Sequence, residues 1–208
     1  MIQGSEEWLR ARIGKVTASR VHDIVATTRS GGFTAGRKNY LAELVTERLT
    51  GEPAPKFVSA AMANGTECEP EARAAYSFHA DVDVEEVGFV EHPTIANAGC
   101  SPDGLVGGDG LIEIKCPNTA THLETLLHGK IDVEYIHQMQ FQLACTGRKW
   151  CDFVSYDKRL PEPMRLYVRR VMHDEIIIAK LELKTNLFLN ELDATVDLLR
   201  KRYMAEAA

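Results

Sequence analysis

The amino-acid sequence predicts an α/β fold in which a central mixed sheet is flanked by helices. Apolar residues repeat at helical spacing over the first 80 residues, alternate with polar ones after residue 81, and return to helical spacing at the end of the chain. A length of 208 residues suits one well-buried core. We therefore expect a single domain over residues 1–208, with a helical N-terminal part (1–80), a sheet core (81–171) and a long C-terminal helix (172–208).

The N-terminal part is expected to hold three helices. Apolar residues at helical spacing indicate helices over residues 21–25 and 41–49, and Gly51 follows the second of these. Thr17 or Ser19 could cap the first helix. A third helix is expected over residues 67–76, after a proline-containing link.

The sheet core begins where the period changes to two. Short strands are predicted near residues 82–90 and at 110–115, where Pro117 ends the second strand. Helices are then expected over residues 123–129 and 133–146, followed by strands over 150–156 and 164–171. A long amphipathic helix from about Ile177 to Leu199 completes the chain.

Charge and composition limit the function classes. The net charge of −6 argues against general adhesion to nucleic acid, which depends on Lys and Arg. Residues 1–38, however, hold seven basic residues against three acidic ones, which leaves room for one local basic surface. The N-terminus is charged and no apolar run is long enough to span a bilayer, so we expect a cytoplasmic protein without membrane contact.

The five cysteines do not indicate a disulfide framework or a zinc site. Their number is odd, and the sequence has neither a Cys-x-x-Cys pair nor a nearby His-x-x-x-His. We expect reduced thiols.

The residues with the clearest chemical pattern are Asp103, Glu113 and Lys115. Side chains two apart in a strand share a face, so Glu113 and Lys115 project together while Ile112 and Ile114 face the core. A hairpin between Gly104 and Gly110 would bring Asp103 beside Glu113, where both carboxylates could hold one hard cation. Such a cation and a nearby lysine are what phosphodiester hydrolysis needs.

A plainer interpretation is a Glu/Lys pair on the solvent face of an antiparallel strand, with Asp-Gly in a turn. A bare match to this short pattern would favour that interpretation. The flanking segments Ser101-Pro102-Asp103-Gly104 and Glu113-Ile114-Lys115-Cys116-Pro117 favour the functional one.

With those segments, further motifs make the sequence resemble the lambda-exonuclease and YqaJ-type viral recombinase family of the PD-(D/E)xK nuclease superfamily. The resemblance runs from about Trp8 to Tyr156. Its other motifs are Trp8 with Arg10-x-Arg12-Ile13-Gly14, Thr17-Ala18-Ser19, Gly65-x-x-x-Glu69 and Gln138-x-Gln140-x-Gln142. It implies the restriction-endonuclease-like core of that superfamily.

The resemblance also implies roles for individual residues. Asp103, Glu113, the Ile114 carbonyl and Glu69 would be metal ligands, Lys115 the catalytic lysine, and Gln140 the glutamine beside the metal and the attacking water. Arg12, Ser19 and Ser101 would hold a terminal 5′ phosphate. Met62 would be an apolar wedge at the terminal base pair, and Arg29 would follow the duplex.

Several of these residues also have ordinary structural interpretations. Thr66-x-x-Glu69 reads as a capping box, so Glu69 could close a helix end, and Pro70 could distort that turn or delay the helix start. Arg12 could be a surface charge, and Met62 a core residue. Gln138 and Gln142 share a helical face that Gln140 does not, so only part of this set can face one site. Three histidines have no partner at the spacing of a metal-ligand pair, and we expect them to be surface groups or groups behind the site: His122, His128 and His137.

The function implied by the resemblance is a 5′-to-3′ exonuclease on linear double-stranded DNA that releases 5′ mononucleotides and leaves 3′ single strands for phage-type recombination by strand annealing. The resemblance further implies Mg²⁺, with Mn²⁺ able to substitute, two ions per site, a homotrimeric ring and a single-strand annealing recombinase as partner. A restriction-like or repair endonuclease and a catalytically inactive DNA-binding protein are the alternatives. A pocket for a 5′ phosphate disfavours the endonuclease, which has no terminus to hold.

Overall fold

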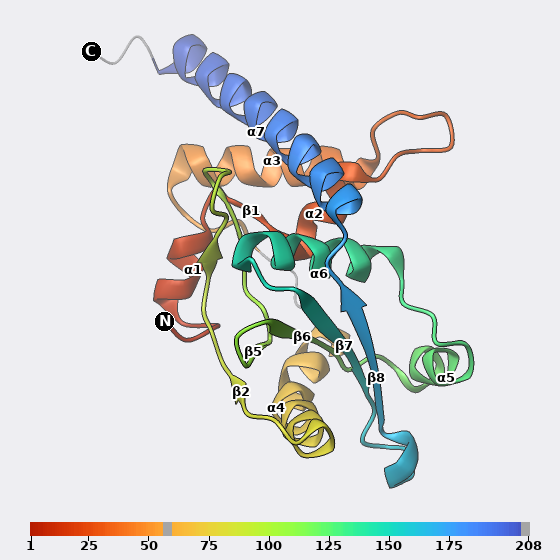
Figure 1. Ribbon diagram of the computed structural model, residues 1–208. Helices are drawn as coiled ribbons and strands as arrows, with labels where there is room; N and C mark the ends of the chain where they lie inside the picture. The colour runs from red at the N-terminus through yellow and green to blue at the C-terminus, as the bar shows by residue number, and fades with distance from the viewer. Residues whose placement is uncertain (56–59, 205–208) are drawn as a thin grey trace.

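A five-stranded mixed sheet lies at the centre of the computed structural model (Figure 1). The structure describes residues 1–55 and 60–204, and of residues 60–64 and 66 the backbone alone. The strand order is β2-β5-β6-β7-β8, in which β6 and β7 are parallel and the other neighbours antiparallel. The strands are β2 (Val84–Glu85), β5 (Gly104–Val106), β6 (Gly110–Lys115), β7 (Trp150–Tyr156) and β8 (Leu166–Met172).

A smaller three-stranded sheet joins the N-terminal part of the chain to the core. Its order is β1-β4-β3, with β1 (Val16–Thr17) parallel to β4 (Ala98–Cys100) and β3 (Val90–Glu91) antiparallel to it. The backbone N–H of Val16 extends this pairing by donating to the Asn97 carbonyl at 2.8 Å. The segment after β1 is thereby held next to the segment that follows β4.

The two faces of the five-stranded sheet are covered by different helices. Helix α4 (Ala60–Ala80) packs on one face against β6, β7 and β8, and α6 (Val133–Thr146) packs on the other (Figure 1). In β6, Ile112 and Ile114 join the α4 side of the core, while Leu111 joins the side of α6. Since side chains alternate along a strand, Glu113 and Lys115 share the α6 face with Leu111.

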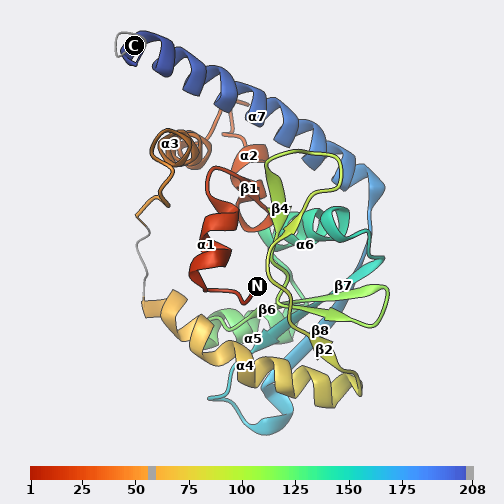
Figure 2. The same ribbon diagram turned by 90° about the vertical axis from the view of Figure 1, so that its left-hand side faces the viewer.

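A third packed region joins the N-terminal helices to the end of the chain. Helix α7 (Glu175–Tyr203) crosses α2 (Val21–Val25) and α3 (Ala35–Thr50) (Figure 2). The ring of Tyr40 stacks on Phe188 with ring centroids 5.6 Å apart. Gly51 ends α3 in the left-handed conformation at φ 72°, and Asp174 caps α7 by accepting from two backbone N–H groups.

The remaining helices are α1 (Glu6–Arg12), η1 (Ala18–Arg20), α5 (Thr119–His128) and η2 (Glu162–Met164). The predicted fold class is confirmed, and α6 and β7 have the predicted bounds. Strand β8 begins at Leu166, later than predicted, because η2 takes up residues 162–164. Thr17 precedes η1 without a side-chain capping bond, so the capping suggested for it is wrong. None of the helices formed by the described residues combines the length and apolar content needed to cross a bilayer.

Candidate active site

The β5–β6 hairpin brings Asp103 beside Glu113, as the sequence predicts. Gly104 pairs with Ile112, so Asp103, one residue earlier, falls opposite Glu113. The Asp103 Oδ2 accepts a hydrogen bond from the backbone N–H of Ile114 at 2.6 Å. Gly107 permits the tight connection because it adopts φ 52°. The carboxylate of Asp103 is thus anchored to the strand that carries Glu113 and Lys115.

The Glu113 carboxylate is buried, with 1% of the residue exposed, and three side chains donate to it. Its Oε1 lies 2.6 Å from Lys115 Nζ and accepts from Gln138 Nε2 at 2.7 Å. Its Oε2 accepts from Gln142 Nε2 at 2.6 Å. A buried carboxylate is tolerated when its oxygens are paired in this way, so Glu113 is held in one orientation.

Opposing charges shift the pKa values of this group of residues. Burial alone would lower the pKa of Lys115, but the nearby Glu113 and Asp103 raise it above its ordinary value. Burial and the charge of Glu113 together raise the pKa of Asp103 well above its ordinary value. Lys115 is therefore a cation at neutral pH, while Asp103 gains its negative charge only against the repulsion of its neighbours.

Glu69 lies in the middle of α4 and faces the same region. Since α4 runs from Ala60 through Pro70 to Ala80, the alternatives that Glu69 closes a helix end and that Pro70 delays the helix start are both wrong. Glu69 Oε1 lies 2.5 Å from Arg73 Nη2, and Arg73 Nε donates to the Asp103 carbonyl at 3.1 Å. Burial raises the pKa of Glu69, against the opposing effect of Arg73.

The structure corrects the assignment of Gln140. Its Nε2 donates to the Met172 carbonyl at 2.7 Å, and its Oε1 accepts from the backbone N–H of Asp174 at 2.8 Å. Gln140 therefore joins α6 to the start of α7, and the prediction that it lies beside the metal and the attacking water is wrong, because it is not next to Asp103 or Glu113. The physical reason is helix geometry: residues four apart share a face, so Gln138 and Gln142 reach Glu113 and Gln140 points away.

The residues suggested for a 5′ phosphate form a polar corner near these carboxylates. Trp8 Nε1 donates to Ser101 Oγ at 2.9 Å, and the guanidinium of Arg12 lies 3.9 Å from the centre of the Trp8 ring. Ser19 is exposed, and its Oγ lies 3.3 Å from Thr17 Oγ1. Among the described residues Arg12 makes no ion pair. A planar guanidinium beside two hydroxyl groups suits phosphate oxygens.

A single cavity of about 230 Å³ joins the carboxylates to the polar corner, and we call it the carboxylate cavity. It draws on α1, η1, α4, β6, α6 and the segment before β5. Its lining includes the predicted residues Arg12, Ser19, Glu69, Ser101, Asp103, Glu113, Ile114 and Lys115, together with Gln3, Trp8, Thr17, Ala18, Gln138 and Gln142. The sequence-predicted residues, apart from Gln140, Arg29 and Met62, thus surround one space.

The donor set of this cavity fits a hard divalent cation. The carboxylates of Glu69, Asp103 and Glu113 and the carbonyl of Ile114 offer oxygen, which Mg²⁺ and similar ions prefer. The mutual repulsion that raises the pKa of Asp103 is what a bound cation would relieve. Among the side chains that the structure describes, no three His, Cys, Asp or Glu groups are gathered as closely as a metal centre requires. Arg73, Lys115 and the two glutamines engage the carboxylates instead.

Arg29 and Met62, the two residues predicted to contact DNA, are not among the described residues that line the carboxylate cavity. Arg29 is exposed on the turn between the bridged residues Thr27 and Phe33, and its contact with DNA stays a prediction. The side chain of Met62 lies outside the described residues. His122 is not a surface group, because it is fully buried and its ring nitrogens lie 2.7 Å from Ser155 Oγ and 2.9 Å from the Met164 carbonyl.

His137 is paired, in a way that the sequence did not indicate. Its Nδ1 lies 2.9 Å from that of His22 on α2. Burial, followed by the charges of His22 and Lys180, lowers the pKa of His137 to about 4. His128 is exposed on α5, as expected.

Sequence reasoning missed four residues of the cavity and its surroundings. Gln138 and Gln142 were visible as a pair four apart, and Arg73 follows Glu69 at the same helical spacing. Gln3 gave no signal: its Nε2 donates to the Pro102 carbonyl at 2.7 Å and the Val87 carbonyl at 2.9 Å, which are contacts across the fold.

Comparisons with known proteins agree with this geometry. Residues 7–149 match the YqaJ-like viral recombinase domain. An alkaline exonuclease from Laribacter hongkongensis, LHK-Exo, is 54% identical in sequence, with 98% of this chain and 100% of that chain covered and a TM-score of 0.89. The crystal structure of LHK-Exo in complex with dAMP gives 53% identity, the same coverage and a TM-score of 0.90.

A more distant similarity supports the fold alone. A phage-related exonuclease from Haemophilus somnus 129PT is 16% identical, with 89% of this chain and 96% of that chain covered and a TM-score of 0.70. The comparison with curated proteins gave no match. The family match covers well over half of the chain and includes the segments that carry Asp103, Glu113 and Lys115, so the chain belongs to the YqaJ-like viral recombinase family.

Proposed function

We propose that this protein is a divalent-metal-dependent exonuclease that degrades linear double-stranded DNA from its 5′ ends, releases 5′ mononucleotides and leaves 3′ single strands. The proposal rests mainly on one cavity. Asp103, Glu113 and Lys115 line it together with the polar corner that is suited to a phosphate, which consists of Arg12, Ser19 and Ser101. The similarity to LHK-Exo over nearly the whole chain supports the same reaction class.

The proposed roles follow from charge and position. Lys115 stays protonated beside Glu113, so it can orient a water molecule or a phosphoryl oxygen and counter the negative charge that develops during hydrolysis. Gln138 and Gln142 keep the Glu113 carboxylate fixed. Arg12, with the hydroxyls of Ser19 and Ser101, would hold the terminal 5′ phosphate and so place the first phosphodiester near Lys115.

Asp103, Glu113, Glu69 and the Ile114 carbonyl are the groups that would hold the metal, in our proposal Mg²⁺ with Mn²⁺ as a substitute and two ions per site. A divalent cation supplies Lewis-acid polarisation of the phosphoryl group when bound. The protein contributes the all-oxygen donor set and the buried orientation of Glu113.

We also propose that residues 1–208 act as a single nuclease domain, because the carboxylate cavity draws residues from the N-terminal helices, the sheet and α6 together. A homotrimeric ring around DNA would explain how a chain with a net charge of −6 stays on its substrate, since encirclement replaces part of the electrostatic attraction. The 3′ single strands would serve recombination by strand annealing, with a single-strand annealing recombinase as partner.

The proposal is tested by comparing a linear duplex that carries 5′ phosphates with a closed circle of the same sequence. We expect Mg²⁺-dependent loss of the linear duplex, release of mononucleotides, survival of the circle and inhibition by chelator. Lys115→Ala should abolish hydrolysis. Lys149→Ala is the matched control, because Lys149 also pairs with a carboxylate, at 2.9 Å from Asp109, but its side chain is 70% exposed and outside the cavity.

Each other outcome points to a different function. Cleavage of the closed circle would favour a restriction-like or repair endonuclease. Binding of DNA without hydrolysis in Mg²⁺ or Mn²⁺ would favour an inactive DNA-binding protein. Equal activity of Lys115→Ala and Lys149→Ala would remove Lys115 from the proposed chemistry.

A further inference from the structure

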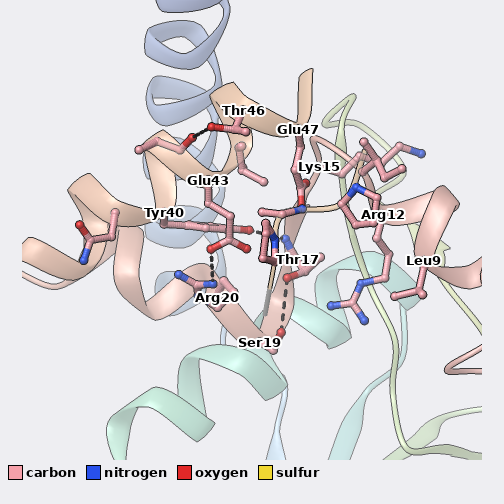
Figure 3. A pocket seen from close by; sticks show the side chains of 17 residues that line it. Leu9, Arg12, Lys15, Thr17, Ser19, Arg20, Tyr40, Glu43, Thr46 and Glu47 are labelled. Carbon is pink, nitrogen blue, oxygen red and sulfur yellow. Dashed lines mark hydrogen bonds and ion pairs between the residues drawn. The ribbon is translucent and has the colours of Figure 1, made fainter. Parts of the chain in front are cut away.

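A second cavity, of about 810 Å³, adjoins the carboxylate cavity. Arg12, Thr17 and Ser19 line both spaces. The second cavity extends from them between α1 and α3, and we call it the α1–α3 cavity. Figure 3 shows Ser19 at one end of it and Thr46 at the other. Its volume lies within the range of about 300–1,000 Å³ that is usual for pockets holding small organic ligands.

The charged side chains inside the α1–α3 cavity make ion pairs or accept backbone hydrogen bonds, whereas Arg12 at its border makes no ion pair among the described residues. Glu43 lies 2.9 Å from Arg20, and Glu47 accepts from the backbone N–H of Gly14 at 2.7 Å. Lys15 pairs with Glu91 at 2.6 Å. Arg12 makes no ion pair among the described residues, so the free positive charge lies at the junction of the two cavities.

The remaining walls suit an uncharged, flat group rather than a second anion. Leu9, Ile13, Pro53 and Pro55 supply apolar surface, and Asn39 adds a polar side chain. Apolar surface with few polar groups is the usual lining of a small-molecule site, and it suits the face of a nucleobase. A phosphate would therefore prefer the border at Arg12, and a nucleoside attached to its 5′ side would fit the cavity beyond it.

We propose that the α1–α3 cavity is a subsite for the nucleoside on the 5′ side of the phosphate held by Arg12, so that DNA ending in a 5′ hydroxyl binds one nucleotide further in than DNA ending in a 5′ phosphate. This proposal rests on the proposed exonuclease function. With a 5′-phosphorylated end, the terminal phosphate occupies the polar corner and the α1–α3 cavity is not used. With a 5′-hydroxyl end, the first internal phosphate takes that corner and the terminal nucleoside enters the cavity.

The shift changes the first product. Water adds to the phosphorus between the second and third nucleotides, the bond from that phosphorus to the 3′ oxygen of the second nucleotide breaks, and this oxygen takes up a proton. The phosphate stays on the shortened strand. The released fragment is a dinucleoside monophosphate with hydroxyls at both ends, and the strand left behind carries the 5′ phosphate used in later turnovers.

The test uses a linear duplex with a single labelled phosphate between its first and second nucleotides, prepared with either a 5′ hydroxyl or a 5′ phosphate. From the 5′-hydroxyl duplex we expect the label first in a dinucleoside monophosphate. From the 5′-phosphorylated duplex we expect it in a mononucleotide. Thr46→Trp should fill the cavity and slow hydrolysis of the 5′-hydroxyl duplex by at least about tenfold, equivalent to about 1.4 kcal/mol, with less than about a twofold change on the phosphorylated duplex.

Thr50→Trp is the matched control. Thr46 and Thr50 are both exposed on α3, and each donates its hydroxyl to the carbonyl four residues earlier at 2.9 Å, but Thr50 does not line the cavity. Ala42→Phe fills the same cavity from an exposed position and replaces Thr46→Trp if that variant does not fold.

The outcomes separate this inference from the proposed function. Label from the 5′-hydroxyl duplex in a mononucleotide, or no hydrolysis of that duplex while the phosphorylated one is degraded, would overturn the subsite. Equal slowing of both duplexes by the cavity-filling variants, or no slowing by them, would overturn it as well. Failure of the wild-type protein to hydrolyse the phosphorylated duplex would instead refute the exonuclease function itself.

Discussion

Replacing the three glutamines of α6 one at a time with leucine should separate catalysis from stability. Gln138 and Gln142 each donate to the buried Glu113 carboxylate, at 2.7 and 2.6 Å. A hydrogen bond to a charged group is worth about 1.5–3 kcal/mol. If that orientation is needed in the transition state, Gln138→Leu and Gln142→Leu should each lower kcat/KM by about 10- to 150-fold.

Gln140→Leu should behave in the opposite way. Its amide satisfies the Met172 carbonyl and the Asp174 N–H at the junction with α7. Leaving a buried backbone group without a partner costs about 1–3 kcal/mol, and these two groups are only partly buried, so the cost falls at the lower end for each. We expect a lower free energy of unfolding, with kcat/KM within about twofold of the wild type wherever the variant is folded.

The assay measures hydrolysis of 5′-phosphorylated linear duplex at saturating Mg²⁺, alongside denaturant unfolding of the same preparations. Steady-state rates at a temperature well below the unfolding midpoint of every variant keep the two effects apart. A loss of kcat/KM in Gln140→Leu as large as that in Gln138→Leu would refute the reasoning, as would full activity of both Gln138→Leu and Gln142→Leu.

Two further predictions concern acid stability and the polar corner. Burial alone would raise the pKa of Asp157, but hydrogen bonds, chiefly from Arg159 at 2.7 Å, lower it to about 2. The folded pKa lies below the unfolded value of about 3.9, so this stabilisation is present above about pH 4 and is lost as the pH falls toward about 2. The difference in unfolding free energy between wild type and Asp157→Asn should shrink across that window in chemical denaturation, and a difference that stays constant would contradict the assignment. Trp8→Phe removes the donor to Ser101 but keeps a ring beneath Arg12. It should raise KM for phosphorylated duplex about two- to tenfold, as expected for a neutral hydrogen bond, and an unchanged KM in steady-state kinetics would show that this bond does not support substrate binding.

Local sequence was enough to predict the centre of the site. Alternation within β6 places Glu113 and Lys115 on one face, and the glycines at 104, 107 and 110 permit the hairpin that returns Asp103 to Glu113. These relations depend on residues within about ten positions of one another, so they can be predicted from the spacing along the sequence alone. The helices and strands with long periodic patterns, such as α6 and β7, were predicted for the same reason.

The contacts between distant segments could not be predicted in this way. Strands β1 and β4 have two and three residues, too few to show a period, yet their pairing brings the segment of Ser19 next to that of Ser101. The error at Gln140 has a different cause. Helical spacing groups Gln138 with Gln142, but it does not say which face of α6 meets the sheet, and the resemblance pointed to the wrong member of the motif.

The charges around the carboxylate cavity give a physical reason for cation binding that does not depend on resemblance. Glu69, Asp103 and Glu113 bring three acidic groups, whereas Lys115 and Arg73 bring two basic ones that contact them directly. Asp103 makes no ion pair among the described residues, and burial and the charge of Glu113 raise its pKa. A protonated Asp103 and a bound divalent cation are alternative ways to relieve this repulsion, so protons and a metal ion would compete at this cavity.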